Sequence, residues 1–197
     1  KACEYSGVDL FVVQQNRLNP TVNLVKQAID EGRFGRLYLL SSNVFWMRPQ
    51  DYYDQAPWRG TWHMDGGALM NQASHYVDLM AWLGGPVARV QALSATLARK
   101  IEAEDSMVMN LQYRSGALGS MAITMLTYPK NLEGSLTLIG EKGTVCLGGP
   151  ALNEILEWQF SDPDFISKAD AQAMNYNPPS VYGFGHAIYY EHLIRYF

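Results

Sequence analysis

The sequence predicts an α+β domain built around a mostly antiparallel sheet, and three observations lead to this class. Stretches rich in β-branched and aromatic residues recur from residue 87 to residue 160. The links between these stretches are short, and short links favour antiparallel pairing. Two patterns with the period of amphipathic helices precede them, at residues 20–31 and 65–83. Most of the strands are therefore expected after the helices rather than alternating with them.

One face of the predicted sheet carries unusually small side chains. Ser120, Ala122 and Thr124 point the same way on one strand, because side chains alternate between the two faces. A flat face of this kind on an open sheet is often covered by another subunit, and solvent is the alternative. We expect the strands at residues 37–46, 87–97, 106–113, 117–127, 133–140, 144–147 and 151–160.

The composition narrows the classes of function. The chain has 197 residues, of which 48% are hydrophobic and 17% charged, so it can bury a sizeable core. Its net charge is −4 and it contains no run of lysine and arginine, which argues against nucleic acid and membrane surfaces as partners. Cys3 and Cys146 lack metal-type spacing, so we interpret them as free thiols in a reducing, cytoplasmic compartment.

The two ends of the chain indicate a piece of a longer protein. Residues 1–8 have the pattern of a helix end closed by Gly7, and residues 10–13 that of a short buried strand. Together they form half of a βα unit, and no G-x-G-x-x-G fingerprint is present in the chain. Residues 161–180 are expected to form a mobile loop. A helix begins after Gly185 and has no closing cap before the chain stops.

Residues 47–62 form an aromatic and polar stretch that is too irregular for a regular helix or strand. Long ordered loops of this composition often carry binding residues. Aromatic faces and guanidinium groups suit the base and the anionic groups of a nucleotide sugar. Alternatively, Trp58 and Trp62 simply cover the core. The candidate binding residues in this stretch are Arg48, Tyr52, Tyr53, Arg59 and Trp62.

The helix expected at residues 65–83 carries polar residues that resemble a site. Asp65 is a plausible N-cap, and a Gly-Gly-Pro sequence at 84–86 ends the helix. Asn71, His75 and Asp78 would lie within about 60° of one another on a 3.6-residue helix. The opposite stripe is apolar and consists of Met70, Ala73, Val77, Met80 and Ala81.

Histidine on an amphipathic helix has a simpler interpretation as well. Such a residue is often exposed, or hydrogen-bonded within the core, without any catalytic role. His63, His186 and His192 have no partners at the spacing of metal ligands, so no metal site is expected.

These residues resemble the glucose–fructose oxidoreductase/inositol dehydrogenase (Gfo/Idh/MocA) family of NAD(P)-dependent sugar dehydrogenases. The resemblance lies in GGALMNQASHYVDLMAWLGGP at 66–86, NRLNP at 16–20 and GEKGTV at 140–145. Within the family, RPQDYYDQAPWRGTW, RSGALGSM and TYPKNLEGS are similar to the UDP-N-acetylglucosaminuronate 3-dehydrogenases of bacterial lipopolysaccharide O-antigen biosynthesis. The resemblance covers essentially the whole chain.

The resemblance implies a two-domain enzyme. Residues 1–15 would be the end of an N-terminal dinucleotide-binding domain, which holds NAD with residues outside this chain. Residues 16–197 would form the substrate and oligomerisation domain, truncated at its C-terminus. That domain has an open, mostly antiparallel sheet of about six to eight strands with helices on one face. It would form a homodimer or homotetramer.

The resemblance also implies roles for single residues. The reaction would oxidise the C3 hydroxyl of a UDP-sugar, with His75 as general base or proton shuttle. Asn71, where many relatives carry aspartate, would contact the reacting hydroxyl. Asp78 would either orient His75 or be a surface charge. Substrate binding would fall to Arg48, Tyr52, Tyr53, Arg59, Trp62, Tyr128, Lys130 and Asn131.

Two other interpretations stay open. The chain could belong to a different sugar or inositol dehydrogenase of the same fold, with residues 47–62 recognising another substrate. It could also act only as a sugar-binding or oligomerisation module. The isolated chain is expected to show no dehydrogenase activity, because hydride chemistry resides in the cofactor.

Overall fold

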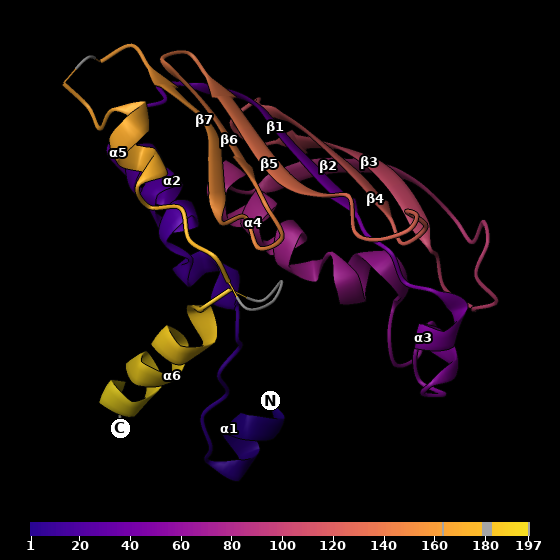
Figure 1. Ribbon diagram of the computed structural model, residues 1–197. Coiled ribbons are helices and arrows are strands. Elements are labelled where there is room, and N and C mark those ends of the chain that lie inside the picture. Colours follow the sequence, from indigo (N-terminus) through magenta and orange to yellow (C-terminus); the bar gives the residue numbers. More distant parts are fainter. Residues whose placement is uncertain (163, 179–182, 197) are drawn as a thin grey trace.

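A computed structural model describes residues 1–162, 164–178 and 183–196. Its centre is one open sheet in the order β2-β3-β4-β1-β5-β6-β7, with α2, α4 and α5 on one side of it (Figure 1). This confirms the predicted fold class. The strands are β1 (Leu37–Phe45), β2 (Val87–Ala95), β3 (Ser106–Tyr113), β4 (Leu118–Thr124), β5 (Glu133–Gly140), β6 (Gly143–Gly148) and β7 (Glu154–Phe160).

The central strand β1 joins the two halves of the sheet. It runs parallel to β4, with Val44 opposite Ile123, and antiparallel to β5, with Leu40 opposite Leu138. All other named strand pairs are antiparallel. The hairpin-length links therefore predicted the pairing correctly, whereas the single parallel pair arises because β1 inserts between strands that come much later in the chain.

The helices are mostly short. The pattern that predicted a helix at 20–31 is confirmed, since α2 begins at Pro20, a residue suited to the first turn. The helix end at Gly7 and the helix after Gly185 are confirmed too. The helical elements are α1 (Ala2–Ser6), η1 (Gln15–Leu18), α2 (Pro20–Asp30), α3 (Gln50–Asp54), η2 (Ala68–Gln72), α4 (Ser74–Gly84), α5 (Lys168–Gln172) and α6 (Gly185–Tyr196).

The core lies between the sheet and the layer formed by α2 and α4. Leu40 and Val44 of β1 are fully buried, as are Val25 of α2 and Leu79 of α4. Alternate residues of β1 enter this core because the side-chain period of a strand is two. The Tyr113 hydroxyl donates to the backbone oxygen of Met80 at 3.1 Å, which fixes α4 against β3.

The prediction of a buried strand at residues 10–13 is wrong. This segment has no strand partner among the described residues, and Leu10 is 73% exposed. A strand needs neighbouring strands to satisfy its backbone groups, and here none lies beside it. The apolar residues are therefore uncovered in this chain, and Phe11 instead contacts the Tyr196 ring of α6 at 5.5 Å.

The prediction of one continuous helix at 65–83 is also wrong. A π-helical turn, η2, precedes α4, and Ala73 between them has φ −99° and ψ 4°. Gly66 and Gly67 have φ of 76° and 79°, a conformation that side chains rarely adopt. Asp65 is consequently no N-cap, and its Oδ2 accepts a hydrogen bond from the Gly60 backbone N–H at 2.6 Å.

The change of helix type also alters the apolar stripe. Met70 of the predicted apolar stripe lies in η2 and is 62% exposed. Ala81 of the same stripe lies in α4 and is exposed too. A π-helix has more residues per turn than an α-helix, so the 3.6-residue spacing does not continue through η2. The residues of α4 that are buried are Tyr76, Leu79, Met80 and Leu83.

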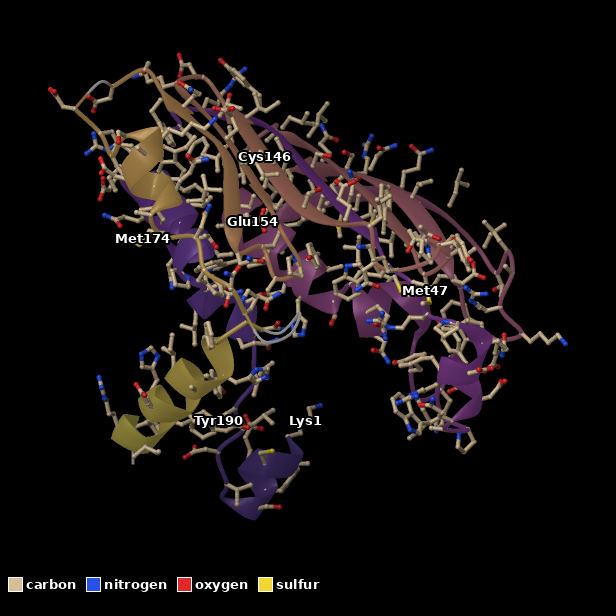
Figure 2. All side chains as sticks on the ribbon, viewed as in Figure 1. Lys1, Met47, Cys146, Glu154, Met174 and Tyr190 are labelled. Carbon is tan, nitrogen blue, oxygen red and sulfur yellow. The ribbon has the colours of Figure 1, made fainter. Side chains whose placement is uncertain are left out.

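Two stretches expected to be irregular contain helices. Residues 47–62 include α3, and Met47 lies where the chain leaves the sheet for this helix (Figure 2). Residues 161–180 include α5, whose N-cap Ser167 accepts from the Asp170 backbone N–H. Of this second stretch, residues 163, 179 and 180 lie outside the described residues.

Candidate functional site

Asn71 on η2 and His75 on α4, two of the three polar residues expected to form a site, line a small cavity of about 220 Å³. It lies beside the end of β1, where the chain turns from the sheet towards α3. Side chains from five separate parts of the chain meet there, which is typical of a binding site on a rigid scaffold. The cavity is lined by Asn16, Trp46, Arg48, Tyr52, Asn71, Gln72, His75 and Tyr76.

A chain of hydrogen bonds fixes the polar wall of this cavity. Gln72 donates from Nε2 to the Tyr52 hydroxyl at 2.9 Å and to Asn71 Oδ1 at 3.1 Å. The Asn71 amide donates from Nδ2 to Asp65 Oδ1. Asn71 is therefore oriented from both ends of its amide. One amide hydrogen and one lone pair of the oxygen are left for a ligand.

The cation of the cavity is Arg48. Its guanidinium lies 5.2 Å from the ring centre of Trp46 and 5.5 Å from that of Tyr52, within the range of cation–π contacts. Nη1 donates to the Met47 backbone oxygen at 2.8 Å and reaches Asn131 Oδ1 at 3.4 Å. A guanidinium has five N–H donors, so Arg48 keeps donors for an anionic ligand.

His75 is half-buried, and both of its ring nitrogens contact glutamines. Nε2 lies 3.3 Å from Gln15 Nε2, and Nδ1 lies 3.4 Å from Gln14 Oε1. Burial lowers the pKa of His75 below 6.5, Asp78 acts to raise this pKa, and His186 acts to lower it. The ring is therefore neutral at neutral pH and can accept a proton.

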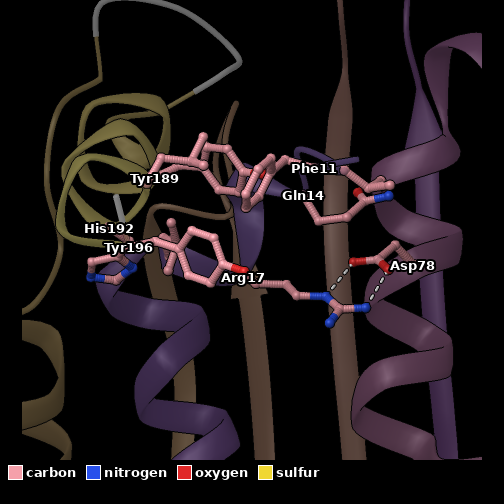
Figure 3. Close-up of a pocket in the computed structure, with 10 residues that line it drawn as sticks. Phe11, Gln14, Arg17, Asp78, Tyr189, His192 and Tyr196 are labelled. Carbon is pink, nitrogen blue, oxygen red and sulfur yellow. Dashed lines mark hydrogen bonds and ion pairs between the residues drawn. The ribbon is translucent and has the colours of Figure 1, made fainter. Parts of the chain in front are cut away.

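Asp78 does not line the His75 cavity. Its two carboxylate oxygens accept from Arg17, with Nε to Oδ2 at 2.8 Å and Nη2 to Oδ1 at 2.6 Å (Figure 3). These residues line a larger hollow of about 590 Å³ against α6. Of the three polar residues expected on one face, Asn71 and His75 thus line the same cavity, whereas Asp78 affects the pKa of His75 electrostatically.

The other candidate binding residues lie at different depths. Arg59 lies 4.1 Å from the Tyr52 ring centre and donates from Nη1 to the Tyr52 backbone oxygen at 2.6 Å. Tyr53 is 6% exposed and belongs to the core, where burial raises its pKa to about 12. Asn131 Oδ1 accepts from the Met47 backbone N–H at 2.8 Å.

The remaining candidates are exposed. Trp62 is 59% and Tyr128 94% exposed, and Lys130 is exposed as well. Trp58, at 41%, is also too exposed to be a lid of the core, so the alternative interpretation of the tryptophans in residues 47–62 is not supported. None of these side chains lines the cavity. Tyr128 and Lys130 shortly precede Asn131, whose Oδ1 reaches Arg48, and we call these two exposed residues the rim of the site.

The cavity residues that the sequence did not single out are Asn16 in η1, Trp46 directly after β1, Gln72 in η2 and Tyr76 in α4. Asn16 is 5% exposed, and its Oδ1 has no hydrogen-bond partner among the described residues although it lines the cavity. A buried polar atom without a partner is costly, so a ligand that donates a hydrogen bond would be favoured here. Asn16 belongs to the motif at 16–20, but no sequence pattern in that motif indicates that η1 packs against α4.

The site has no metal-type donor set. No group of three or more His, Cys, Asp or Glu side chains is placed to hold a metal ion in the described part of the chain. Cys3 and Cys146 are both free thiols. None of the described helices is long and apolar enough to cross a membrane. The available donors, a neutral imidazole, amides and a guanidinium, suit a polar and anionic organic ligand.

Comparison with known proteins identifies the family. Residues 22–146 match the GFO/IDH/MocA C-terminal domain, and the chain therefore belongs to this family. A comparison with curated proteins gives no match.

Solved structures add closer relatives. The chain is 59% identical to the WlbA dehydrogenase from Bordetella pertussis in complex with NADH and UDP-GlcNAcA, covering 98% of this chain and 56% of that one, with a TM-score of 0.89. The chain is 56% identical to the WlbA dehydrogenase from Chromobacterium violaceum, also in complex with NADH and UDP-GlcNAcA. That match covers 98% of this chain and 54% of that one, with a TM-score of 0.90. Levoglucosan dehydrogenase in complex with NADH and levoglucosan shares the fold, with a TM-score of 0.74. It is 20% identical, and the match covers 96% of this chain and 58% of that one. The chain thus spans about half the length of the WlbA enzymes.

Proposed function

We propose that this chain is the substrate domain of an NAD-dependent oxidoreductase. The substrate would be a nucleotide sugar of the UDP-N-acetylglucosaminuronate type, oxidised at its C3 hydroxyl in lipopolysaccharide O-antigen biosynthesis. The observation that carries the proposal is the cavity in which a neutral His75, Asn71 and Arg48 converge. The 59% identity to a WlbA dehydrogenase solved with NADH and UDP-GlcNAcA supports the same substrate.

His75 would take the proton in this reaction. The hydroxyl proton of C3 passes to the imidazole, the hydrogen on C3 leaves with its electron pair, and the C3–O bond becomes a ketone. NAD, when bound, supplies the acceptor for that hydride. Asn71 would hold the hydroxyl with its remaining amide hydrogen or lone pair. The amide of Asn71 cannot titrate, so the proton chemistry on this side rests with His75.

The anionic groups of the substrate would be bound around Arg48. A UDP-uronate carries a diphosphate and a carboxylate, and Arg48 has unused donors beside the cavity. Arg59, in contact with Tyr52, adds positive charge next to the cavity, and the exposed Lys130 adds another beside Asn131. Tyr52 and Trp62 offer faces for the sugar or the base. We assign substrate binding to Arg48, Tyr52, Tyr53, Arg59, Trp62, Tyr128, Lys130 and Asn131, of which Tyr53 acts from the core through Tyr52.

The cofactor would be held largely outside this chain. No G-x-G-x-x-G occurs in the sequence, and the described residues fit the substrate side of the reaction. We propose that residues 1–15 end a dinucleotide-binding domain and that residues 16–197 are the substrate domain. The uncovered apolar side chains of Val8, Leu10 and Val12 support this, because they would be buried in such a domain.

The open face of the sheet would join copies of this chain into a homodimer or homotetramer in the cytoplasm. Leu93, Val108 and Leu118 are more than half exposed on it, and Ser120 and Ala122 between them are small. Small and apolar side chains together allow a second sheet to approach closely. Val108→Arg should reduce the oligomer to a smaller species in light scattering, and an unchanged mass would refute the assignment of this face.

Turnover tests the function directly. The full-length protein should form NADH from UDP-GlcNAcA and should be at least 100-fold slower with free glucose or myo-inositol. Preferred turnover of one of the free sugars would place the protein with another dehydrogenase of the family. Binding without any turnover of any of them would support a non-catalytic module. The isolated 197-residue chain should form no NADH, and turnover by it would contradict the proposed division into domains.

A further inference from the structure

The segment immediately before α2 contacts His75 and its neighbour Asp78 from outside their helix. Gln14 and Gln15 lie against the two nitrogens of the imidazole, and Arg17 holds both oxygens of Asp78. These contacts join residues about 60 positions apart in the chain and come from one short stretch at the start of η1. None of the roles assigned above uses Gln14, Gln15 or Arg17.

The two glutamine amides fit one protonation form of the ring. Gln14 presents its Oε1 to Nδ1, and Gln15 presents its NH₂ group to Nε2. This arrangement satisfies a neutral imidazole with hydrogen on Nδ1 and a lone pair on Nε2. A charged ring would carry hydrogen on both nitrogens, so Gln15 would then have to turn its amide. Gln15 is 1% exposed, so this contact disfavours the charged ring until the amide turns or is displaced.

Arg17 forms an ion pair with Asp78, the carboxylate that affects the pKa of His75. The guanidinium of Arg17 forms a bidentate pair with Asp78, whose side chain is 15% exposed (Figure 3). It also lies 5.1 Å from the Trp82 ring centre. Asp78, one helical turn from His75, favours protonation of the ring, and an unpaired carboxylate would favour it more strongly. The titratable and charged groups that face His75 are Asp78 on α4, Arg17 on η1, His186 on α6, and Arg48, Tyr52 and Tyr76 around the cavity.

We propose that residues 14–17 are a positioning segment for His75: Gln14 and Gln15 hold the resting ring neutral, with hydrogen on Nδ1 and the lone pair on Nε2, and Arg17 limits the effect of Asp78 on it. The inference deepens the proposed function, because it keeps the ring in the form that accepts a proton; the substrate hydroxyl takes the place of the Gln15 amide at Nε2 before the proton moves. Asp78 is then neither a direct partner of His75 nor an indifferent surface charge. It favours proton binding by His75, and its ion pair with Arg17 limits that effect.

The test is the titration of His75 in the full-length protein, followed by NMR of ¹⁵N-labelled histidine and assigned with His75→Gln. In the wild type, the pKa should lie below 6.5, and the neutral ring should carry its hydrogen on Nδ1. Arg17→Gln should raise the pKa by about one unit, since a carboxylate nearby is then uncompensated. Arg17→Lys keeps the charge and should stay close to the wild type. Arg17→Gln combined with Asp78→Asn should remove the rise.

Asp78→Asn alone keeps the test decisive if Arg17→Gln fails to fold. This variant should lower the pKa of His75, because it removes the one negative charge that raises it. An unchanged pKa in both Arg17→Gln and Asp78→Asn, or hydrogen on Nε2 in the neutral wild-type ring, would overturn the inference.

The pH profile of kcat/KM separates this inference from the proposed function. In Arg17→Gln, the acidic limb of the profile should move to higher pH together with the pKa measured by NMR, because activity requires the neutral ring. A shift in the NMR titration without movement of the acidic limb would leave the positioning role intact and refute His75 as the base.

Discussion

The side chains that line the cavity, called the wall, and the exposed side chains of the rim differ in how they are held. Asn71, His75 and Arg48 of the wall each have hydrogen-bonded or ring partners from other elements. Tyr128 and Lys130 of the rim are exposed, and their side chains extend from a link between β4 and β5. The wall therefore exists before a ligand arrives, whereas the rim would have to be ordered by one.

This difference sets the expected energetic order of the two regions. Preorganised groups lose little conformational entropy when a ligand binds. Long exposed side chains lose more, and this loss offsets much of the binding free energy of their contacts. Substitutions in the wall should therefore affect turnover and binding strongly, and substitutions in the rim weakly.

The largest effect should come from the wall at the reacting group. In the full-length enzyme, His75→Ala should lower kcat about 10²- to 10⁴-fold, the range for loss of a general base. Asn71→Ala should act more mildly, because it removes orientation but no proton acceptor. Steady-state kinetics with UDP-GlcNAcA measure both. A change of KM with unaltered kcat in His75→Ala would leave His75 a substrate contact only.

The next largest effect should come from Gly67, which precedes η2 and supports the wall from beneath. A Cβ at Gly67 would collide with the buried Glu104 carboxylate, in addition to the strain of φ 79°. A Cβ at Gly116, where φ is 91°, would meet nothing within 4 Å. Gly116→Ala should cost about 1–3 kcal/mol of unfolding free energy from backbone strain alone. Gly67→Ala should cost clearly more and also lower kcat, because η2 carries Asn71. Urea denaturation measures the difference, and equal costs would contradict the close packing of Glu104 on η2.

Arg48 tests how strongly the wall binds anions. Arg48→Met should raise KM for the UDP-sugar about 10- to 100-fold, since a charge-assisted hydrogen bond contributes about 1.5–3 kcal/mol. The matched control is Arg114→Met, which removes the same group from an exposed turn and should leave KM unchanged. Equal effects in the two variants would mean that long-range charge, and not the cavity, binds the substrate.

The smallest effect should be at the rim. Lys130→Ala should raise KM only about 1.5- to 5-fold, because an exposed ion pair contributes about 0.2–1 kcal/mol. The effect should shrink further in high salt, which screens exposed charges. If Lys130→Ala proved as damaging as Arg48→Met, the division into a firm wall and a weak rim would not hold.

Much of the sheet could be predicted from the sequence. The bounds of β3 and β5 match the predicted residues 106–113 and 133–140, because alternating polarity and short links define such strands locally. The strand predicted at residues 10–13 failed since strands need neighbours that this chain does not place beside it. The parallel pairing of β1 with β4 joins residues about 80 positions apart, and nothing local predicts it.

The site could be predicted only in part. Asn71 and His75 are four residues apart, so local spacing brought them together even though η2 is not α-helical. For Asp78 the sequence left an orienting role and a surface charge open, because its partner Arg17 comes from a distant segment. Gln14, Gln15 and Asn16 carry no periodic or compositional signal. Their importance follows only from the packing of η1 against α4.

The central claim is that the cavity beside His75 receives the reacting end of the sugar. A crystal structure of the full-length protein with NAD and UDP-GlcNAcA tests it most directly. We expect the C3 hydroxyl oxygen within hydrogen-bond reach of His75 Nε2, about 2.6–3.2 Å, in place of the Gln15 amide and with Asn71 beside it. A sugar ring bound outside this cavity, or a C3 hydroxyl facing a different proton acceptor, would contradict the account.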